Sequence, residues 1–286
     1  VVRKYGVAFS PNKCNWEKIQ GDIVFEDVSF MYPDGKEYVL EHFDLHVPAG
    51  MNVAIVGETG AGKSTLVNLV GRFFEPTKGR ILIDGVDYRE RSQLWLHSQI
   101  GYVLQNPHLF SGTVRENIRY GRLDASDEEI EEAARNVSAD MVVAKMEKGY
   151  DSDVGESGGL LSTGEKQLIS FARAVLANPA IFVLDEATSS IDTQTEKLIQ
   201  DATNHLLKGH TSFVIAHRLS TIRQADLILV VKDGKIIERG SHPELLEQKG
   251  YYYELYSRQF EEEEAMKVFA GATFAGETDW ESVCQP

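Results

Sequence analysis

Residues 57–65 read Gly57-Glu58-Thr59-Gly60-Ala61-Gly62-Lys63-Ser64-Thr65 and directly follow the apolar run 53–56. That run has the length and composition of a buried strand, and the apolar residues after the stretch are spaced as on one face of a helix. These residues are Leu66, Leu69, Val70, Phe73 and Phe74. A strand, a glycine-rich loop of the form GxxxxGK[ST] and a helix, in this order, predict a phosphate-binding loop.

The residue types in this loop suit a nucleotide. Glycines let backbone N–H groups close around an anion, and the following helix adds the positive end of its dipole. Lys63 is expected to reach the β- and γ-phosphates, and the Ser64 hydroxyl to contact Mg²⁺. The alternative is a flexible turn with an unrelated lysine. The pattern GxxxxGK[ST] arises by chance in a chain of this length about one time in a hundred.

The composition is that of a globular protein with an acidic surplus. Of the 286 residues, 42% are hydrophobic, and the formal net charge is −15. The length suggests one large domain or two small ones, and the charge argues against a nucleic-acid partner, because a basic surplus is needed to neutralise phosphates. Cys14 and Cys284 lie near opposite ends, which indicates neither a disulfide framework nor a zinc site. With no apolar run near ~18 residues and no signal-peptide pattern, we expect a soluble chain in a reducing cytosol.

Changes of pattern along the chain predict its domain organisation. Residues 1–20 show no periodicity and are expected to form a linker, and strand patterns begin at Ile23. We expect one α/β domain over residues 21–258. The acidic residues and uneven composition of 259–286 predict a solvated tail.

A helical insertion is expected inside this domain, over about residues 108–176. A capping box at Ser126 opens a helix through about Asn136, and a second helix is expected over 139–148. The glycine-rich stretch 155–165 then precedes another helix, whose N-terminus could bind phosphate or be an ordinary capped helix start.

Two carboxylates follow the apolar run 180–184, which has the pattern of a strand buried on both faces of a parallel sheet. In open α/β sheets, ligands bind at the carboxyl ends of such strands. Asp185 is therefore placed to hold Mg²⁺ through water, and Glu186 to polarise an attacking water. An acidic pair before a turn is usually solvated surface, but the buried strand and the phosphate-binding loop favour the functional interpretation.

Three other residues at the ends of predicted strands are candidates, and two of them have ordinary alternatives. Tyr32 could stack on a nucleotide base, although a lone tyrosine at a strand end more often only packs against its neighbours. Gln105 could hold Mg²⁺ or its water through the side-chain oxygen, or be a solvated turn residue. His217 follows the buried strand pattern 212–216.

Taken together and in this order, the motifs resemble the nucleotide-binding domain of an ABC transporter over about residues 21–258. The resemblance implies an α/β fold, with a P-loop NTPase core built on a mostly parallel sheet, an antiparallel β subdomain and an inserted α-helical subdomain. It also implies binding of ATP and Mg²⁺ and hydrolysis of ATP. Residues 161–165 stand where the family has its LSGGQ signature, and residues 190–192 resemble its D-loop.

The resemblance assigns roles to single residues. It implies that Asp185 is the Walker B aspartate, Glu186 the catalytic base and His217 the switch histidine, while Gln105 matches the Q-loop. The residues implied to contact ATP are Tyr32, Gly57, Thr59, Gly60, Ala61, Gly62, Lys63, Ser64 and Thr65, and, toward ATP held by a facing partner, Ser162, Gly164 and Glu165. The implied Mg²⁺ residues are Ser64, Gln105 and Asp185, and the implied catalytic residues are Glu186, His217 and Gln105.

Two stretches resemble ABC exporters in particular. Residues 111–118 and 155–158 are similar to segments that couple to the intracellular helices of the membrane domain. The resemblance therefore implies ATP-driven export at the cytoplasmic face of the cell membrane. The implied partners are a second nucleotide-binding domain and the transmembrane domains of an exporter, with no nucleic acid, and the linker 1–20 would descend from a sixth transmembrane helix that is not present here.

Two rival functions are a soluble ABC-type ATPase that acts on nucleic acid and a nucleotide-gated binding module without turnover. The acidic balance and the exporter-like stretches argue against the first. The intact pair Asp185-Glu186 and His217 argue against the second.

The signature Leu161-Ser162-Thr163-Gly164-Glu165 departs from the family pattern, because Thr163 replaces a glycine and Glu165 a glutamine. A β-branched side chain restricts how closely the backbone approaches a phosphate, and a carboxylate repels phosphate charge. The Walker B and switch residues are unaltered. The resemblance implies a head-to-tail dimer. The mismatch favours a heterodimer with two unequal ATP sites, in which this chain is one subunit; the alternative is a homodimer whose signature tolerates both residues.

Overall fold

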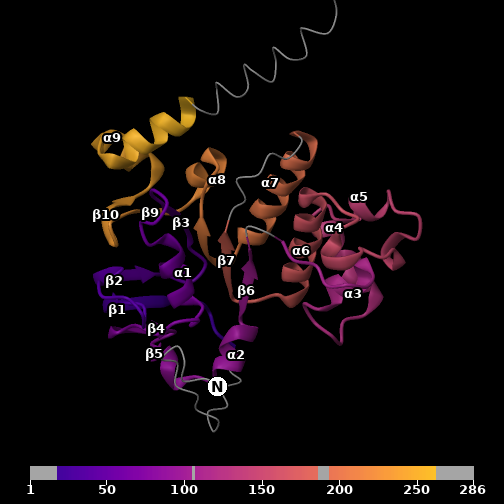
Figure 1. Cartoon of the computed structure of the whole chain (residues 1–286), viewed down its shortest axis with the longest axis horizontal. Helices are drawn as coiled ribbons and strands as arrows, with labels where there is room; N and C mark the ends of the chain where they lie inside the picture. Colours follow the sequence, from indigo (N-terminus) through magenta and orange to yellow (C-terminus); the bar gives the residue numbers. More distant parts are fainter. Residues whose placement is uncertain (1–17, 105–106, 186–192, 262–286) are drawn as a thin grey trace, which may run out of the picture.

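The computed structural model describes residues 18–104, 107–185 and 193–261 and contains two sheets (Figure 1). The smaller sheet is antiparallel where its pairing is resolved and has the strand order β2-β1-β4-β5. Its strands are β1 (Ile23–Phe30), β2 (Leu40–Val47), β4 (Lys78–Ile83) and β5 (Val86–Asp87). The larger sheet has the order β10-β9-β3-β8-β7-β6, and only the edge strand β10 runs antiparallel to its neighbour. Its strands are β3 (Asn52–Val56), β6 (Ile100–Val103), β7 (Ile181–Asp185), β8 (Thr211–Ile215), β9 (Leu227–Lys232) and β10 (Lys235–Gly240).

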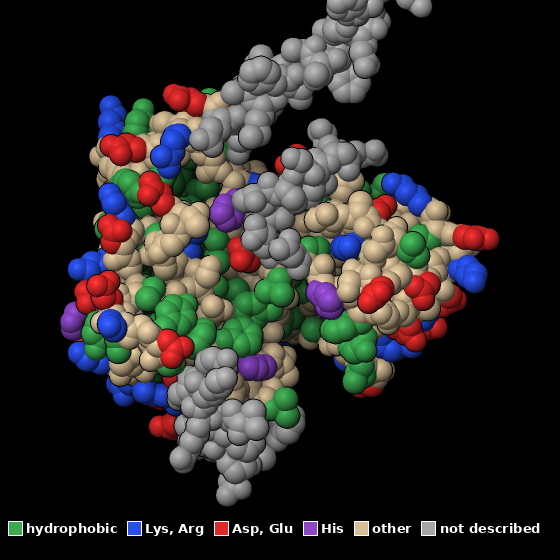
Figure 2. All heavy atoms as spheres, viewed as in Figure 1, with side chains coloured by type: hydrophobic (Ala, Val, Ile, Leu, Met, Phe, Trp, Pro, Cys, Tyr) green, Lys and Arg blue, Asp and Glu red, His purple; other side chains and the backbone are tan. Residues whose placement is uncertain are grey.

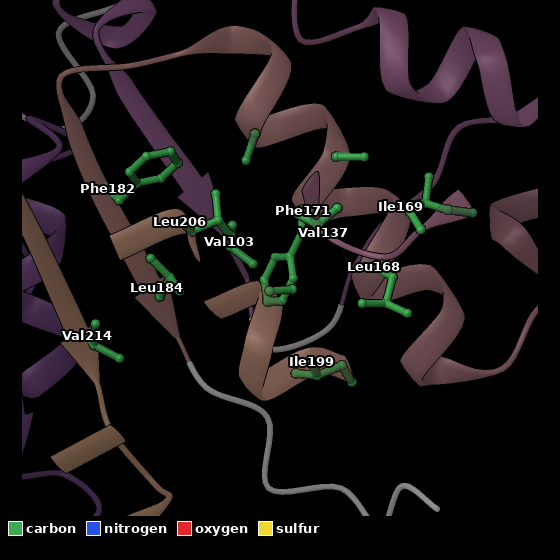
Figure 3. Packing of buried hydrophobic residues seen from close by; sticks show 14 of the residues in the cluster. Val103, Val137, Leu168, Ile169, Phe171, Phe182, Leu184, Ile199, Leu206 and Val214 are labelled. Atoms are coloured by element: carbon green, nitrogen blue, oxygen red, sulfur yellow. The ribbon is translucent and has the colours of Figure 1, made fainter. Parts of the chain in front are cut away.

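Alternate residues of the central strands enter two different hydrophobic cores, as the two-residue period of a strand requires. Ile55 of β3 belongs to the core shared with α1 (Lys63–Val70) and the smaller sheet. Its neighbour Val56 belongs to the core beneath α6 (Thr163–Ala177) and α7 (Thr193–Leu207). Figure 3 shows this second core, in which Leu184 of β7 is joined by Phe171 of α6 and Leu206 of α7.

The predicted helical segment forms a separate lobe at the right of Figure 1. Its helices α3 (Val114–Arg119), α4 (Asp127–Asn136) and α5 (Asp140–Val143) lie beyond α6. The capping boxes at Thr113, Ser126 and Ser162 start α3, α4 and α6. Acidic and basic side chains are interspersed over this lobe (Figure 2), which marks it as solvated surface. The predicted fold class, with its mostly parallel sheet, antiparallel β subdomain and helical insertion, is confirmed.

The remaining helices lead into the larger sheet, connect two of its strands or follow it. They are α2 (Gln93–Ser98), α8 (Leu219–Gln224) and α9 (His242–Gln248), and residues 251–261 form a last helix, which we call the C-terminal helix. None of the helices in the described ranges is both long and apolar enough to cross a bilayer.

The helix after the glycine-rich loop is shorter than the apolar pattern predicts. It ends at Val70, and the chain turns into the left-handed region at Arg72, with φ of 52°. This turn buries the Arg72 guanidinium, which pairs with Glu75 at 2.8 Å and donates to backbone carbonyls. Phe73 therefore lies outside the helix and is 45% exposed, because buried ion pairing outweighs the helical pattern here.

The second helix expected in the insertion is also shorter than predicted. Only Asp140–Val143 is α-helical, and turns follow it up to the 3₁₀ segment Gly149–Asp151. Val142 and Val143 are buried, but the next residues, Ala144 and Lys145, are exposed. Short helices need packing to be stable, so the helix ends here, and Met146 packs against the core from the turn that follows.

Candidate functional site

The phosphate-binding loop connects the buried end of β3 to the first residue of α1. Gly57 begins the loop with φ of 149°, and a Cβ at this position would lie 2.1 Å from the carbonyl oxygen of Val231. Gly60 and Gly62 also have positive φ values, of 84° and 106°. The loop therefore needs glycine to hold its shape, and it leaves backbone N–H groups at the start of α1 for an anion.

Lys63 bridges this loop from the inside. Its Nζ donates to the carbonyl oxygen of Gly57 at 2.7 Å and to that of Glu58 at 2.8 Å. Burial lowers the pKa of Lys63, while the carboxylates of Asp185 and Glu58 oppose this shift. The site thus holds a desolvated cation, which gains from an incoming polyphosphate.

Strand register brings the candidate residues from distant parts of the chain to one edge. Ile215 of β8 pairs with Ile55 of β3 on one side and with Asp185 of β7 on the other. The phosphate-binding loop follows β3, and His217 follows β8. Both therefore lie at the same carboxyl edge of the sheet as Asp185. Parallel sheets place ligand sites at this edge.

The electrostatics of Asp185 and His217 reflect this proximity. Burial raises the pKa of the Asp185 carboxyl, although the charges of His217 and Lys63 act in the opposite direction. Burial, with help from the charge of Lys63, lowers the pKa of His217, and Asp185 opposes that shift. Partial burial therefore makes the charged form of each group less stable than it would be in water. Such shifted pKa values are common at functional sites.

A cleft of about 590 Å³ joins these residues to Tyr32. The Tyr32 hydroxyl hydrogen-bonds the Thr65 hydroxyl at 3.0 Å, and its ring meets that of Phe74 edge-on at 5.1 Å. Tyr32 is half-buried. Its ring packs against a neighbour, as a tyrosine at a strand end often does, and its side chain also lines the cleft. The described lining consists of Tyr32, Val39, Thr59, Gly60, Gly62, Lys63, Ser64, Thr65, Asp185, Ile215 and His217.

The cleft contains the donor types that Mg²⁺ and phosphate require. The exposed Ser64 hydroxyl and the Asp185 carboxylate supply hard oxygen ligands for Mg²⁺. The loop N–H groups and Lys63 supply positive charge for phosphate. The residues present therefore fit a bound Mg²⁺–nucleotide.

The signature loop lies outside the described lining of this cleft. The hydroxyl of Ser162 accepts from the backbone N–H of Glu165 at 3.3 Å, and the Glu165 carboxylate accepts from the N–H of Ser162 at 2.9 Å. Thr163 is exposed and Gly164 is buried. Glu165 therefore places its negative charge on the N-terminus of α6, the end of that helix that would attract an anion.

Several expected residues lie outside the described ranges. Gln105 and Glu186 are among them, as are residues 190–192 and most of the linker and tail. Sequence reasoning also missed Val39 and Ile215, two apolar residues that line the cleft. Ile215 could have been found from the strand pattern, whereas nothing in the local sequence distinguishes Val39.

Comparisons with known proteins agree with this geometry. The model of the ABC transporter family matches residues 40–189. The chain is 54% identical over 241 residues to an ABC transporter ATP-binding protein of Bacillus subtilis, covering 84% of this chain and 40% of that protein. It is 54% identical over 237 residues to the fatty acid ABC transporter ATP-binding/permease protein of Mycobacterium tuberculosis, covering 83% and 37%. It is 49% identical over 245 residues to the ATP-dependent lipid A-core flippase of Salmonella typhimurium, covering 85% and 42%.

A solved structure is similar as well. The structure of a bacterial Atm1-family ABC exporter with ATP bound superposes with a TM-score of 0.81 and 42% identity, covering 88% of this chain and 44% of that one. The chain thus spans about two fifths of the length of the curated relatives it matches.

Proposed function

The chain belongs to the ABC transporter family, as an exporter-type ATPase domain, and we propose that it binds Mg²⁺–ATP in the cleft at the carboxyl edge of its larger sheet. The observation that carries this proposal is the meeting of Lys63, Asp185 and His217 at that edge, from three separate strand ends. Each comes from a different part of the chain, so a common function explains their convergence better than chance.

The chain's own groups divide the binding of the nucleotide between them. In this proposal the N–H groups of the loop and Lys63 hold the β- and γ-phosphates, and Tyr32 meets the adenine. Ser64, Asp185 and Gln105 would hold Mg²⁺, which neutralises phosphate charge when it is bound. Lys63 exchanges its contacts with two loop carbonyl oxygens for contacts with phosphate oxygens.

Hydrolysis needs a base and a donor near the phosphate to be cleaved. We assign the base to Glu186, whose carboxylate would take a proton from the attacking water. His217 is held toward its neutral form by burial, so its ring N–H can donate to a phosphate oxygen without bringing a second full charge.

A second nucleotide-binding domain is proposed to complete the site. In a head-to-tail dimer the signature residues Ser162, Gly164 and Glu165 of one chain would face ATP held by the other. The start of α6 suits this role, because Ser162 and Thr163 are exposed there. The first N–H groups of a helix have no intrahelical partners and can bind an anion. The altered signature then predicts that this chain is one half of a heterodimer.

The proposed output is export across a membrane through attached transmembrane domains, with this domain at the cytoplasmic face. The relatives named as ATP-binding/permease proteins support this assignment. So do the large apolar side chains of Leu104 and Phe110, which are 54% and 42% exposed. Hydrophobic side chains also gather in the hollow between the helical lobe and the rest of the molecule (Figure 2). Exposed apolar patches mark docking surfaces.

Glu186→Gln tests the catalytic assignment. The amide keeps the shape of the side chain but cannot accept the proton, so phosphate release should fall by about 10²–10⁴-fold while ATP still binds. Lys63→Ala should instead lose ATP binding. Turnover of Glu186→Gln within a few-fold of the unchanged chain would reject Glu186 as the base. Tight ATP binding with no phosphate release by the unchanged chain would favour a nucleotide-gated module.

A further inference from the structure

The C-terminal helix, residues 251–261, reaches back to the carboxyl edge of the larger sheet (Figure 1). Its first turn is fixed by Glu238 of β10, whose carboxylate accepts from the backbone N–H groups of Tyr251 at 2.6 Å and Tyr252 at 2.9 Å. A carboxylate at the N-terminus of a helix satisfies free donors and complements the helix dipole. The helix therefore starts from a defined point on the sheet.

Aromatic contacts hold the middle of this helix against α8 and α9. Tyr252 is buried, and its hydroxyl hydrogen-bonds Nδ1 of His242 at 2.6 Å. The ring of Tyr256 lies 4.9 Å from that of His242, and the Arg223 guanidinium lies 5.6 Å from the centre of the Tyr256 ring. Arg223 also donates to the Tyr256 hydroxyl at 2.7 Å. These contacts fix the direction in which the helix continues.

The end of the helix meets the two loops that form the nucleotide site. The side-chain amide of Gln259 donates to the backbone carbonyl oxygen of His217. One residue earlier, Arg258 pairs with Glu58 of the phosphate-binding loop at 3.8 Å.

The ion pair of Arg258 and the hydrogen bond of Gln259 differ in how strongly they hold the helix end. The side chains of Arg258 and Glu58 are 62% and 60% exposed, and such surface pairs contribute little. Gln259 is half-buried, and it holds the backbone of the residue whose ring lines the cleft. A hydrogen bond to that carbonyl restricts the path of the chain between β8 and α8, and so the direction of the imidazole.

We propose that Gln259 is a positioning residue that holds His217 in its hydrolytic orientation from the C-terminal helix. The proposal rests on the assignment of His217 to hydrolysis. Gln259 lies outside the described lining of the cleft, and in this proposal it acts through its bond to the backbone of His217. The C-terminal helix is thereby part of the hydrolytic machinery, and its attachment at Glu238 and Arg223 sets how firmly the histidine is held.

Two substitutions at Gln259 separate the hydrogen bond from packing. Gln259→Ala removes the whole amide, whereas Gln259→Met keeps the length of the side chain without charge and removes its hydrogen-bond donor. Both should lower kcat for ATP hydrolysis by the full chain about three- to tenfold, the range expected for one neutral hydrogen bond. The KM for ATP and the melting temperature should change little. Glu254→Ala, an exposed change on the same helix, is the matched control.

A double-mutant cycle with His217→Ala decides whether the effect passes through the histidine. In the His217→Ala background, Gln259→Ala should cause no further loss, because there is no ring left to orient. Additive losses, or unchanged kcat in both Gln259 variants, would overturn the proposal. If His217→Ala itself leaves hydrolysis intact, the assignment of His217 to hydrolysis fails, and with it the basis of the inference.

Discussion

Lys63 folds back onto the residue that begins its own loop, with its Nζ 2.7 Å from the carbonyl oxygen of Gly57. The loop is thus closed by the same cation that is proposed to bind the β- and γ-phosphates. Because the pKa of Lys63 is lowered by burial, its ammonium group is poorly solvated and should gain strongly from a phosphate. Its two hydrogen bonds to loop carbonyl oxygens hold the curved shape of the loop.

Lys63→Ala is therefore expected to abolish useful ATP affinity. Hydrogen bonds to charged groups are worth about 1.5–3 kcal/mol each, which corresponds to at least a tenfold loss and to more than a hundredfold if two are lost. Titration calorimetry with Mg²⁺–ATP measures this loss directly. Lys145→Ala, an exposed lysine in the helical lobe, is the control and should bind normally. Unchanged affinity of Lys63→Ala would reject the phosphate-binding assignment.

Two glycines of the loop should respond differently to alanine. At Gly57 a Cβ would meet the Val231 carbonyl oxygen at 2.1 Å, so Gly57→Ala must displace the loop or β9. At Gly60 nothing lies within 4 Å of the added Cβ, and only the positive φ of 84° opposes the change. Gly60→Ala should cost about 1 kcal/mol, and Gly57→Ala clearly more. Thermal unfolding of both variants tests this order, and equal melting temperatures would contradict it.

The parts of this site that follow from local sequence were predictable, and the parts that depend on distant contacts were not. Buried strand patterns located Asp185 and His217 at one edge, because parallel strands share their carboxyl ends. The end of α1 was wrong because the burial of Arg72 against Glu75 outweighs an apolar spacing that continues through Phe73. The bond from Gln259 to His217 joins polar residues far apart in sequence, and no periodicity encodes such a pair.

Acid should destabilise the domain through two half-buried histidines, His97 and His210. Burial lowers the pKa of His97 and of His210 below the ordinary value of 6.5. In the unfolded chain these rings take up a proton as the pH falls through 6.5, while in the folded protein they still resist it. The unfolded state then binds more protons than the folded state. The free energy of unfolding should therefore decrease as the pH is lowered through this range.

The measurement is the melting temperature between about pH 7.5 and about pH 5.5, where carboxylates contribute little. His97→Gln combined with His210→Gln should flatten the dependence, since neither replacement titrates. The matched control is His42→Gln combined with His46→Gln, two exposed histidines that bond to aspartates. If the control flattens the curve as much as the half-buried pair His97 and His210 does, their partial burial is not the cause.

The altered signature should make the two ATP sites of a dimer unequal. Glu165 adds a negative charge at the N-terminus of α6, and Thr163 stands exposed in the first turn of that helix. In a dimer of identical chains every intact Glu186 would face this weakened loop. In a heterodimer this chain's Walker residues could face an unaltered signature, leaving one site that turns over and one that mainly binds.

Restoring the family residues tests this asymmetry in the complete exporter. Thr163→Gly with Glu165→Gln should keep the helix start, because glutamine at this position can still accept from the Ser162 N–H. Glu129→Gln is the matched control, because Glu129 forms the same capping box with Ser126, at 2.8 and 3.3 Å, away from the site.

A heterodimer subunit expressed alone should hydrolyse ATP weakly, and the double restoration should raise its activity by about tenfold or more, since one hydrogen bond to a charged phosphate is worth roughly 1.5–3 kcal/mol. The Glu129→Gln control should leave activity unchanged, which ties any gain to the signature and not to helix capping in general. Vigorous hydrolysis by the unaltered chain alone, unchanged by the restoration, would show that its signature tolerates both residues and that a homodimer suffices. Because Glu186 and His217 are the same in every variant, a gain on restoration can come only from the loop that faces the partner's nucleotide.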